Sequence, residues 1–147
     1  MFLVVVSLIF SGMCACAGEP IMFTSCNVPG TIASVDVYPC PSQPCIFRHG
    51  INGTVKVTFK TVFPALSLKT ELYAILAGVS ASLPLPNPDG CKDSGITCPI
   101  KAGSLVTYHT TVPVLKQYPS LRLVVKWVLR DENNNMQFCF QFPIEIK

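Results

Sequence analysis

Residues 121–146, LRLVVKWVLRDENNNMQFCFQFPIEI, decide the fold class, because apolar and polar side chains alternate with a period of two on either side of a polar turn. Such alternation is typical of strands that have one face in a core and the other toward solvent. The polar run DENNN at 131–135 is typical of a hairpin turn. We therefore predict two antiparallel strands joined by a hairpin. Their inward faces are Leu121, Leu123, Val125, Trp127 and Leu129 on the first strand, and Phe138, Phe140, Phe142, Ile144 and Ile146 on the second.

The rest of the chain repeats this pattern in short segments. Residues 54–61, TVKVTFKT, alternate in the same way, and weaker strand candidates lie at 20–25, 31–38, 68–78 and 103–115. The 13 prolines along the chain disfavour long helices. A chain of 147 residues is long enough for one domain with its own core. Short strands with turn signals between them predict an all-β sandwich of two antiparallel sheets, with essentially no α-helix.

The N-terminal segment predicts export. Residues 1–18 hold a short apolar run followed by small residues, and this run is too short for a bilayer-spanning helix, which needs roughly 20 residues. The triplet ACA at 15–17 fits a signal-peptide cleavage site. We predict a signal peptide at 1–18, cleaved after Ala17 or Gly18, and an exported domain at 19–147. No later segment is long and apolar enough to be a candidate membrane span.

Export determines how the cysteines are interpreted. The chain has 8, and Cys14 and Cys16 lie in the predicted signal peptide, which leaves six in the exported domain. An even number in an exported chain of this size indicates disulfides, and the oxidising compartment argues against a zinc site. The spacing favours local closure of the loops 40–45 and 91–98, but the sequence alone leaves the connectivity open. The six residues are Cys26, Cys40, Cys45, Cys91, Cys98 and Cys139.

The sequence carries no recognisable catalytic or metal-binding pattern. It has only two histidines, His49 and His109, and their spacing is not that of metal ligands. Neither a G-x-S-x-G turn nor a glycine-rich phosphate loop occurs, and the acidic residues are mostly isolated. We therefore predict that the protein is not an enzyme and has no catalytic residue, metal or cofactor.

The charged residues are few and dispersed. The formal net charge is +3, and the lysines and arginines occur mostly singly, without interleaved aromatic residues. This dispersion argues against nucleic-acid binding. A mild positive charge is compatible with transient contact with anionic membranes, while ordinary solubility is the simpler explanation for any single lysine.

Apolar residues make up 50% of the chain, and charged residues 13%. A solid core and two sheets that enclose a ligand would both give the observed alternation, so periodicity does not separate these cases. Residues 82–90, SLPLPNPDG, hold three alternating prolines, which impose an extended backbone. This stretch is either a rigid loop between the sheets or the rim of an opening lined by Leu83 and Leu85.

Several motifs relate the chain to a known family. They are PCPSQPC at 39–45, PLPNPDGCKDSGITCPI at 84–100, YPSL at 118–121 and VVKW at 124–127, preceded by EP at 19–20. Over its whole exported length the chain resembles the soluble Niemann–Pick type C sterol carriers, within the MD-2-related lipid-recognition (ML) domain family. The resemblance implies an immunoglobulin-like β-sandwich with a lipid pocket between its two antiparallel sheets. It also implies the disulfides Cys26–Cys139, Cys40–Cys45 and Cys91–Cys98.

The resemblance also implies a set of site residues. Leu83 and Phe140 are smaller than the aromatic side chains of the best-known members, so we expect a larger or reshaped cavity that accepts cholesterol or a similar lipid. Asp89 and Lys92 fall on positions implied in lipid transfer or partner contact, although solvation of a loop explains them more simply. Asn52 begins an N-x-[ST] glycosylation motif. The implied ligand-binding residues are Val37, Leu83, Val114, Tyr118, Pro119, Leu121, Trp127 and Phe140.

The function that the resemblance implies is lipid carriage. It indicates a soluble, monomeric protein, secreted or in the lysosomal lumen, that binds a sterol or other lipid and transfers it between membranes. The implied partner is the multispanning Niemann–Pick type C membrane protein, together with transient contact with anionic membranes. The alternative is an MD-2-like or chemosensory carrier that presents a fatty acid or signal lipid to a receptor.

Overall fold

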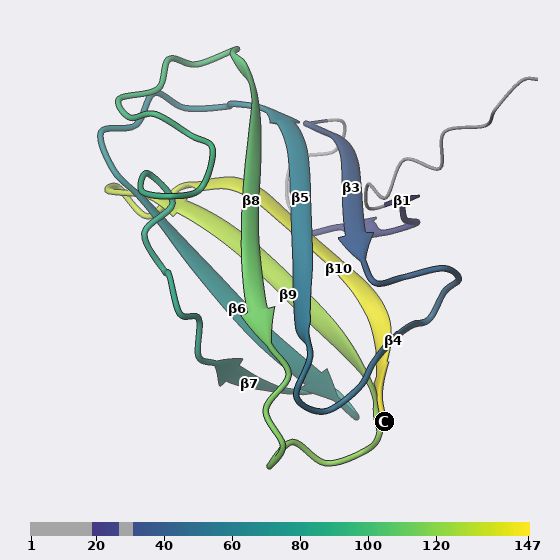
Figure 1. The fold of residues 1–147 in the computed structure, drawn as a ribbon. Helices are drawn as coiled ribbons and strands as arrows, with labels where there is room; N and C mark the ends of the chain where they lie inside the picture. Colours follow the sequence, from purple (N-terminus) through teal and green to yellow (C-terminus); the bar gives the residue numbers. More distant parts are fainter. Residues whose placement is uncertain (1–18, 27–30) are drawn as a thin grey trace, which may run out of the picture.

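The computed structural model describes residues 19–26 and 31–147, so the predicted signal peptide lies outside the described residues. The described residues form strands and no helix (Figure 1), which confirms the all-β prediction. The strands are β1 (Glu19–Pro20), β2 (Thr24–Ser25), β3 (Ile32–Tyr38), β4 (Cys45–Phe47), β5 (Asn52–Lys60), β6 (Leu68–Leu76), β7 (Val79–Leu83), β8 (Leu105–Pro113), β9 (Arg122–Asp131) and β10 (Met136–Ile146).

Two sheets face each other across the core. The smaller sheet has four strands in the order β1-β3-β5-β8, and the larger has six, in the order β2-β10-β9-β6-β7 with β4 beside β10. The short β4 runs parallel to β10, and the other pairs are antiparallel. In Figure 1, β3, β5 and β8 form one layer, and β6, β9 and β10 form a second layer that crosses it at an angle. The predicted β-sandwich is confirmed.

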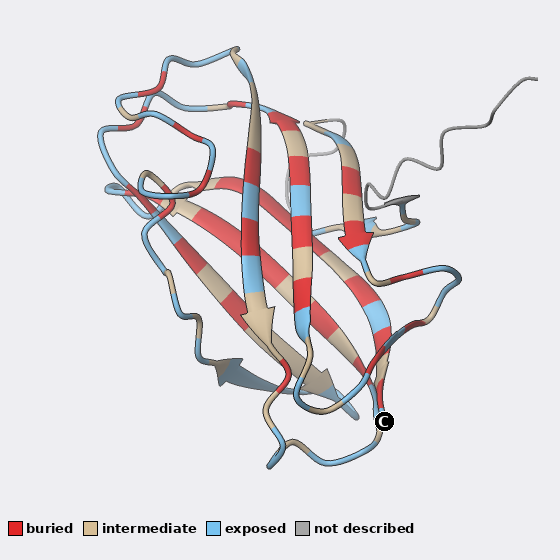
Figure 2. Cartoon of the chain, in the orientation of Figure 1, coloured by how far each residue is buried: buried red, intermediate tan, exposed pale blue. Residues whose placement is uncertain are grey.

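The hairpin predicted at 121–146 forms the centre of the larger sheet. β9 and β10 pair along most of their length, with Phe140 opposite Trp127. Asp131 holds the turn, because one of its carboxylate oxygens accepts the backbone N–H groups of Asn133 and Asn135, each at 2.9 Å. Buried and more exposed residues alternate along the long strands and appear as bands in Figure 2. The period-two pattern of the sequence is therefore the pattern of burial.

One predicted strand divides in the structure, and another ends two residues earlier than predicted. Residues 20–25 contribute β1 and β2, which belong to different sheets. The strand predicted at 68–78 ends at a tight turn, where Ala77 (φ 50°) and Gly78 (φ 79°) take left-handed conformations and the chain returns as β7. Two successive positive φ values suit the two-residue turn of a hairpin. Neither β7, whose side chains are mostly small, nor the three-residue β4 gives a strong strand signal in the sequence.

Three disulfides link the described cysteines. Cys40–Cys45 and Cys91–Cys98 close local loops, and Cys26–Cys139 joins the end of β2 to β10 across a sequence separation of 113 residues. In the chain-entropy model, a closure of that length contributes on the order of 4–5 kcal/mol, more than either short loop. The long disulfide therefore fixes the N-terminal strand to the centre of the larger sheet.

Aromatic rings fill one end of the space between the sheets. The Phe138 ring lies edge-on to Phe59 at 5.0 Å between centroids, 5.8 Å from Tyr108 and 5.6 Å from Phe140. All four residues are at most 1% exposed. Because rings from both sheets meet here, this end of the sandwich is a solid core.

Residues 84–100 form a side wall that closes one flank of the sandwich. The backbone N–H of Thr70 on β6 donates to the carbonyl of Pro88 at 2.8 Å, and the N–H of His109 on β8 donates to a carbonyl of the disulfide loop, also at 2.8 Å. Gly90 permits this approach, because a Cβ at that position would lie 2.8 Å from atoms of two leucine side chains. The side wall thus bridges β6 and β8, which belong to different sheets.

A polar cluster lies on the outer face of the larger sheet. Glu71 Oε2 accepts hydrogen bonds from the Tyr73 hydroxyl at 2.5 Å and from Arg130 Nε at 3.2 Å. Burial raises the pKa of Glu71, but the hydrogen bonds from Tyr73 and Arg130 and the nearby positive charges outweigh it, so the pKa lies below its usual value. Lys126 Nζ lies 6.0 Å from the centre of the Tyr73 ring. These contacts connect β6 to β9.

Candidate functional site

A cavity of about 500 Å³ lies between the sheets, beyond the aromatic core. Its walls come from the ends of β5 and β8 on one side, from β6, β7, β9 and β10 on the other, and from the connection 113–121. This volume is in the range of pockets that hold one small organic ligand. The lining residues are Phe47, Gly53, Val55, Leu72, Ala74, Leu76, Ala77, Val79, Ala81, Leu83, Val112, Pro113, Val114, Tyr118, Pro119, Leu121, Leu123, Val125, Trp127, Phe142, Ile144 and Ile146.

The strands produce the cavity by a change in side-chain size along their inward faces. On β5, Gly53 and Val55 line the cavity, whereas Phe59 belongs to the aromatic core. Gly53 leaves room for the Phe47 ring, because a Cβ on this glycine would lie 3.1 Å from Phe47 Cε1. Trp127 on β9 is 3% exposed and marks the closed end of the cavity, beside the aromatic core. The same alternation thus gives a solid interior at one end and a hollow at the other.

The opening lies between the β6–β7 hairpin and the connection 113–121. Leu76 and Val79 line the cavity and are also 50% and 70% exposed, respectively, which places them at its edge. Opposite them, His49 Nε2 lies 2.6 Å from the backbone carbonyl of Tyr118, so this contact holds the connection against the segment between β4 and β5. These loops come together at the lower end of the molecule in Figure 1.

The chemistry of the lining is almost entirely apolar. Among the described lining residues, none has a charged side chain, and the only polar side-chain groups are the Tyr118 hydroxyl and the indole N–H of Trp127. Burial raises the pKa of Tyr118, so this hydroxyl stays neutral. Burying roughly 400 Å² of ligand surface would gain on the order of 10 kcal/mol, of which association and ordering cost a part. Such a cavity can hold an apolar molecule tightly without any charged contact.

The predicted ligand-binding residues divide into two groups. Val37 and Phe140 are buried, at 1% and 0% exposed, but lie outside the lining. Phe140 is opposite Trp127 on the neighbouring strand of the same sheet, so it lies beside the cavity wall. Val37 is likewise opposite Val55, which lines the cavity. The other predicted residues line the cavity itself: Leu83, Val114, Tyr118, Pro119, Leu121 and Trp127.

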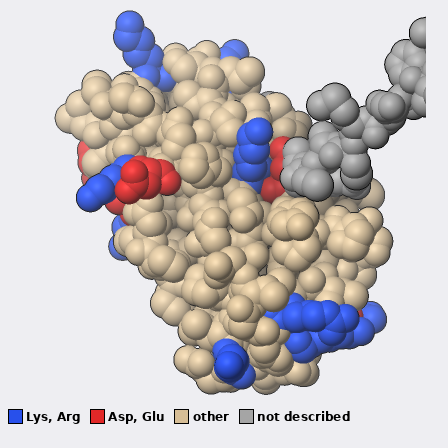
Figure 3. Space-filling model, viewed as in Figure 1, with Lys and Arg blue, Asp and Glu red and all other residues tan. Residues whose placement is uncertain are grey.

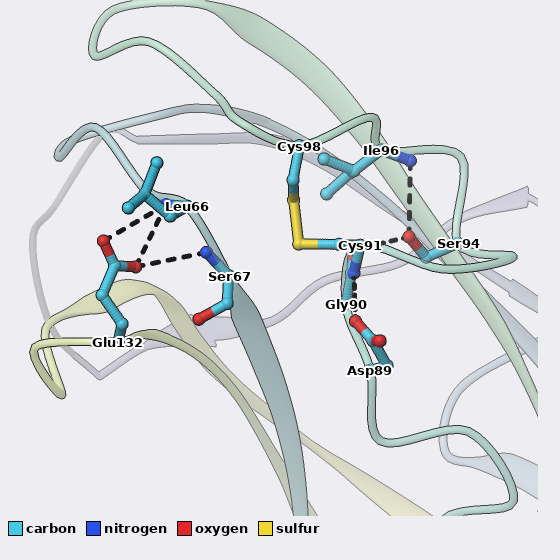
Figure 4. The surroundings of a disulfide bond; sticks show 9 residues. All are labelled: Leu66, Ser67, Asp89, Gly90, Cys91, Ser94, Ile96, Cys98 and Glu132. Carbon is cyan, nitrogen blue, oxygen red and sulfur yellow. Dashed lines mark hydrogen bonds between the residues drawn. A yellow bond between two sulfur atoms is a disulfide. The ribbon is translucent and has the colours of Figure 1, made fainter.

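The remaining predicted residues lie outside the cavity. Asp89 Oδ1 accepts the backbone N–H of Cys91 at 2.9 Å (Figure 4), and the Lys92 carbonyl accepts a hydrogen bond from Asn87 Nδ2 at 2.6 Å. These contacts shape the turn at the start of the disulfide loop, and the side chains of Asp89 and Lys92 are exposed. Asn52 is exposed at the start of β5, opposite the last residue of β8, and so lies beside the opening.

Sequence reasoning missed the part of the wall that β4 and β6 contribute and, apart from Leu83, the part from β7. Leu72, Ala74 and Leu76 line the cavity from β6, and Ala81 from β7. The spacing of the three β6 residues places them on one face of a strand, and this signal could have identified them. The contribution of β7 depends on the hairpin at Gly78, which the sequence pattern did not reveal.

Within residues 19–26 and 31–147, no group of three or more histidine, cysteine, aspartate or glutamate side chains is placed to hold a metal ion. The same residues contain no helix of the length and hydropathy needed to cross a membrane.

Two facing sheets with an apolar cavity between them define a β-sandwich of the ligand-enclosing class. The ML domain family model matches residues 20–146, and the chain belongs to this family. The NPC intracellular cholesterol transporter 2 of Bos taurus is 39% identical over 147 residues, which cover 99% of this chain and 98% of the relative. The protein of the same name from Danio rerio is 40% identical over 129 residues, covering 87% and 86%. The predicted family is confirmed.

Solved structures agree with this fold. The crystal structure of a Niemann-Pick type C2 protein from the Japanese carpenter ant matches with a TM-score of 0.80 and 26% identity, over 86% of this chain and 100% of that one. Chicken MD-1, crystallised with lipid IVa, matches with a TM-score of 0.58 and 18% identity, over 84% and 86%. At that identity, the second likeness concerns the fold alone.

Proposed function

We propose that this protein binds a sterol or a similar lipid in its cavity and carries it between membranes. The observation that carries the proposal is the cavity of about 500 Å³, whose described lining has no charged side chain. Membership of the ML domain family and the cholesterol-transporter name of the bovine relative support a lipid as the occupant. The protein's part in this function is to remove an apolar molecule from water, and we assign no catalytic step to it.

The proposed binding site has two groups of residues. Leu83, Val114, Tyr118, Pro119, Leu121 and Trp127 would contact the lipid, because they line the cavity. Val37 and Phe140 would act from the side, by packing next to Val55 and Trp127 on the neighbouring strands. Because Leu76 and Val79 at the opening are 50% and 70% exposed, the polar end of the lipid would remain there, beside Tyr118.

Membrane contact would occur at the opening. Arg48 precedes His49, whose backbone N–H donates to the carbonyl of Lys147 at 3.1 Å, and Lys116 lies near Gly50. Lys and Arg side chains also gather at the lower right of the molecule in Figure 3, the end at which Figure 1 marks the C-terminus. Basic residues beside exposed apolar ones favour an anionic membrane surface. We propose that the lipid enters and leaves while this end touches a membrane.

Location and partners form a second part of the proposal. Residues 1–18 would act as a signal peptide, cleaved after Ala17 or Gly18, and the domain 19–147 would be secreted or reach the lysosomal lumen as a monomer. The partner would be a multispanning Niemann–Pick type C membrane protein, with Asp89 and Lys92 on the contact surface and a glycan on Asn52. Edman sequencing of the secreted protein and removal of its glycan with an amidase test the cleavage and the glycan.

A receptor-presenting carrier is the second candidate function. The fold likeness to chicken MD-1 keeps it open, since that protein was crystallised with lipid IVa. Such a carrier would retain its lipid in the presence of vesicles and would bind a receptor in its loaded form. A transfer protein would exchange its lipid between vesicles without a receptor.

The test is lipid uptake and transfer by the secreted protein. We expect native mass spectrometry to show one cholesterol or fatty acid per chain, and donor and acceptor vesicles to exchange labelled cholesterol faster when the protein is added. Ala74→Phe places a ring in the cavity and should abolish both effects, because Ala74 lines it from β6. Ile75→Phe, the adjacent residue on the opposite face of β6, is the matched control. A folded protein that takes up neither lipid would contradict the proposal.

A further inference from the structure

Two buried hydroxyl groups lie between the sheets without a partner. Thr70 on β6 is 2% exposed and Tyr108 on β8 is 1% exposed, and neither Thr70 Oγ1 nor Tyr108 OH forms a hydrogen bond within the described part of the chain. Buried hydroxyls are normally paired, because an unpaired one keeps the full cost of leaving water. Two such groups in one place therefore call for a functional explanation.

The two hydroxyls belong to one polar cluster. Burial raises the pKa of Tyr108, and the Thr70 and Thr110 hydroxyls are near enough to lower it in part, although the groups do not reach hydrogen-bond geometry. Thr110 is 7% exposed. The three hydroxyls thus come from both sheets and meet inside the sandwich, and we call them the hydroxyl cluster.

The hydroxyl cluster lies just beyond the closed end of the main cavity. Thr70 is two residues before Leu72 on β6, and Thr110 is two residues before Val112 on β8. Leu72 and Val112 line the cavity. Because residues two apart on a strand share a face, the threonines continue the two cavity walls by one row. The inward faces of β6 and β8 therefore change from apolar side chains to hydroxyl groups one row beyond the cavity.

A second, smaller cavity of about 200 Å³ lies beside β6, and Thr70 is the member of the hydroxyl cluster that lines it. Leu72 and Leu83 line both cavities, so these two side chains stand between them. The space exists because β7 pairs with β6 only as far as Leu83, and the chain meets β6 again where Pro88 accepts the Thr70 N–H. Its other lining residues are Lys69, Glu71, Tyr73, Ser82, Leu85 and Pro88.

We propose that the hydroxyl cluster and the smaller cavity form a polar subsite for the buried end of the ligand. The inference rests on the proposed function and specifies its ligand class: a lipid with a polar group at each end, one at the opening and one oxygen at the far end. A hydroxyl or carbonyl there would pair with Thr70 Oγ1 and Tyr108 OH. A lipid with a purely hydrocarbon end would leave both groups unpaired. Side-chain-hydroxylated sterols and fatty acids with a terminal hydroxyl share this chemistry.

The experiment compares two matched ligand pairs on the lipid-free, disulfide-bonded protein. One pair is cholesterol and cholesterol hydroxylated at the end of its side chain; the other is palmitic acid and palmitic acid with a hydroxyl on its terminal carbon. Displacement of a fluorescent sterol gives four Kd values for each variant. The readout is the selectivity ratio, the Kd of the plain lipid divided by that of its hydroxylated partner. The pair with the larger ratio identifies the lipid class that the subsite fits.

The variants remove one hydroxyl each while preserving shape. We expect Thr70→Val and Tyr108→Phe each to lower the selectivity ratio of the preferred pair about tenfold, the effect of one lost hydrogen bond that leaves a buried group unpaired. Thr111→Val, on the exposed outer face of β8, is the matched control and should leave the ratio within twofold of wild type. Thermal unfolding of each lipid-free variant verifies that it is folded.

The outcomes separate the subsite from the proposed function. If plain lipids bind but the hydroxylated partners bind at least tenfold more weakly in both pairs, the subsite is wrong and the proposed function stands. The same holds if both substitutions leave the ratio within twofold of wild type. If no lipid of either pair binds the folded wild-type protein, the proposed function is wrong, and the subsite, which rests on it, is wrong as well.

Discussion

Two leucines on β9 give a matched test of where the interior is solid. Leu129 is 0% exposed and lies outside the cavity, whereas Leu123 lines the cavity and is 8% exposed. A change to alanine removes the same atoms at both sites, worth about 2 kcal/mol in transfer free energy. At Leu129 the change also creates a new void, for a total cost of about 3–5 kcal/mol. At Leu123 the side chain already borders open volume, so we expect a cost of only about 1–2 kcal/mol.

The assay is urea unfolding of the lipid-free protein with its disulfides intact. With a slope of about 2 kcal/mol/M, a difference of about 2 kcal/mol places the midpoint of Leu129→Ala roughly 1 M below that of Leu123→Ala. Saturating cholesterol should narrow this gap, because the ligand then packs against Leu123 and the truncation loses that contact. Equal costs at the two sites, with or without lipid, would refute the account of one solid end and one hollow end.

Three further outcomes follow from particular contacts. Gly90→Ala should lower the free energy of unfolding by about 1–3 kcal/mol in urea titrations, because the added carbon would lie 2.8 Å from two leucine side chains; an unchanged midpoint would show that the side wall can shift. The lowered pKa of Glu71 means that its ionised form stabilises the folded state, so this contribution is complete above the ordinary carboxyl pKa of about 4.3 and is lost as the pH falls through the lower folded value. Glu71→Gln should therefore flatten the acid limb of a plot of stability against pH, and an unaltered limb would refute the assignment. Replacing Cys26 and Cys139 together with serine should cost about 4 kcal/mol in calorimetry, well above the cost of opening the loop 40–45, and equal losses would contradict the loop-length argument.

The strands were predictable because burial imposes a period of two on the side chains. The run from Leu121 to Ile146 shows this most clearly, since both of its strands lie at the centre of the larger sheet and are packed on their inner face. The edge strand β7 was not predictable in this way, because its residues are mostly exposed and small. Its position depends on the positive φ values of Ala77 and Gly78, which the pattern of hydrophobicity does not record.

The cavity was not predictable from periodicity. On β5, Val55 faces the hollow end and Phe59 the solid end, yet both are inward residues of one alternating strand. What distinguishes them is the size of the side chains that meet from the opposite sheet, and this depends on strand order and register. The family resemblance named lining residues such as Val114 and Trp127. It also named Phe140, which is opposite Trp127 on the neighbouring strand and lies outside the cavity lining.

The hydroxyl cluster was also outside the reach of the sequence. Thr70 lies two residues from Leu68 and from Leu72, so the period of two places it on their inward face, but the pattern does not show what its hydroxyl meets there. Tyr108 and Thr110 share a face of β8, and only the facing of β6 and β8 brings Thr70 to them. The period-two pattern can place a polar residue on an inward face, but only the structure shows which groups that residue meets.

The central claim is that an apolar lipid occupies the hollow end of the sandwich, and Trp127 can report it directly. Trp127 is the single tryptophan of the chain, and it lines the cavity. Titration with a fluorescent sterol that absorbs at the tryptophan emission wavelength should give energy transfer that saturates at one sterol per chain and is reversed by cholesterol. The claim would be contradicted if energy transfer is absent, or if it rises without saturation and added cholesterol does not reverse it.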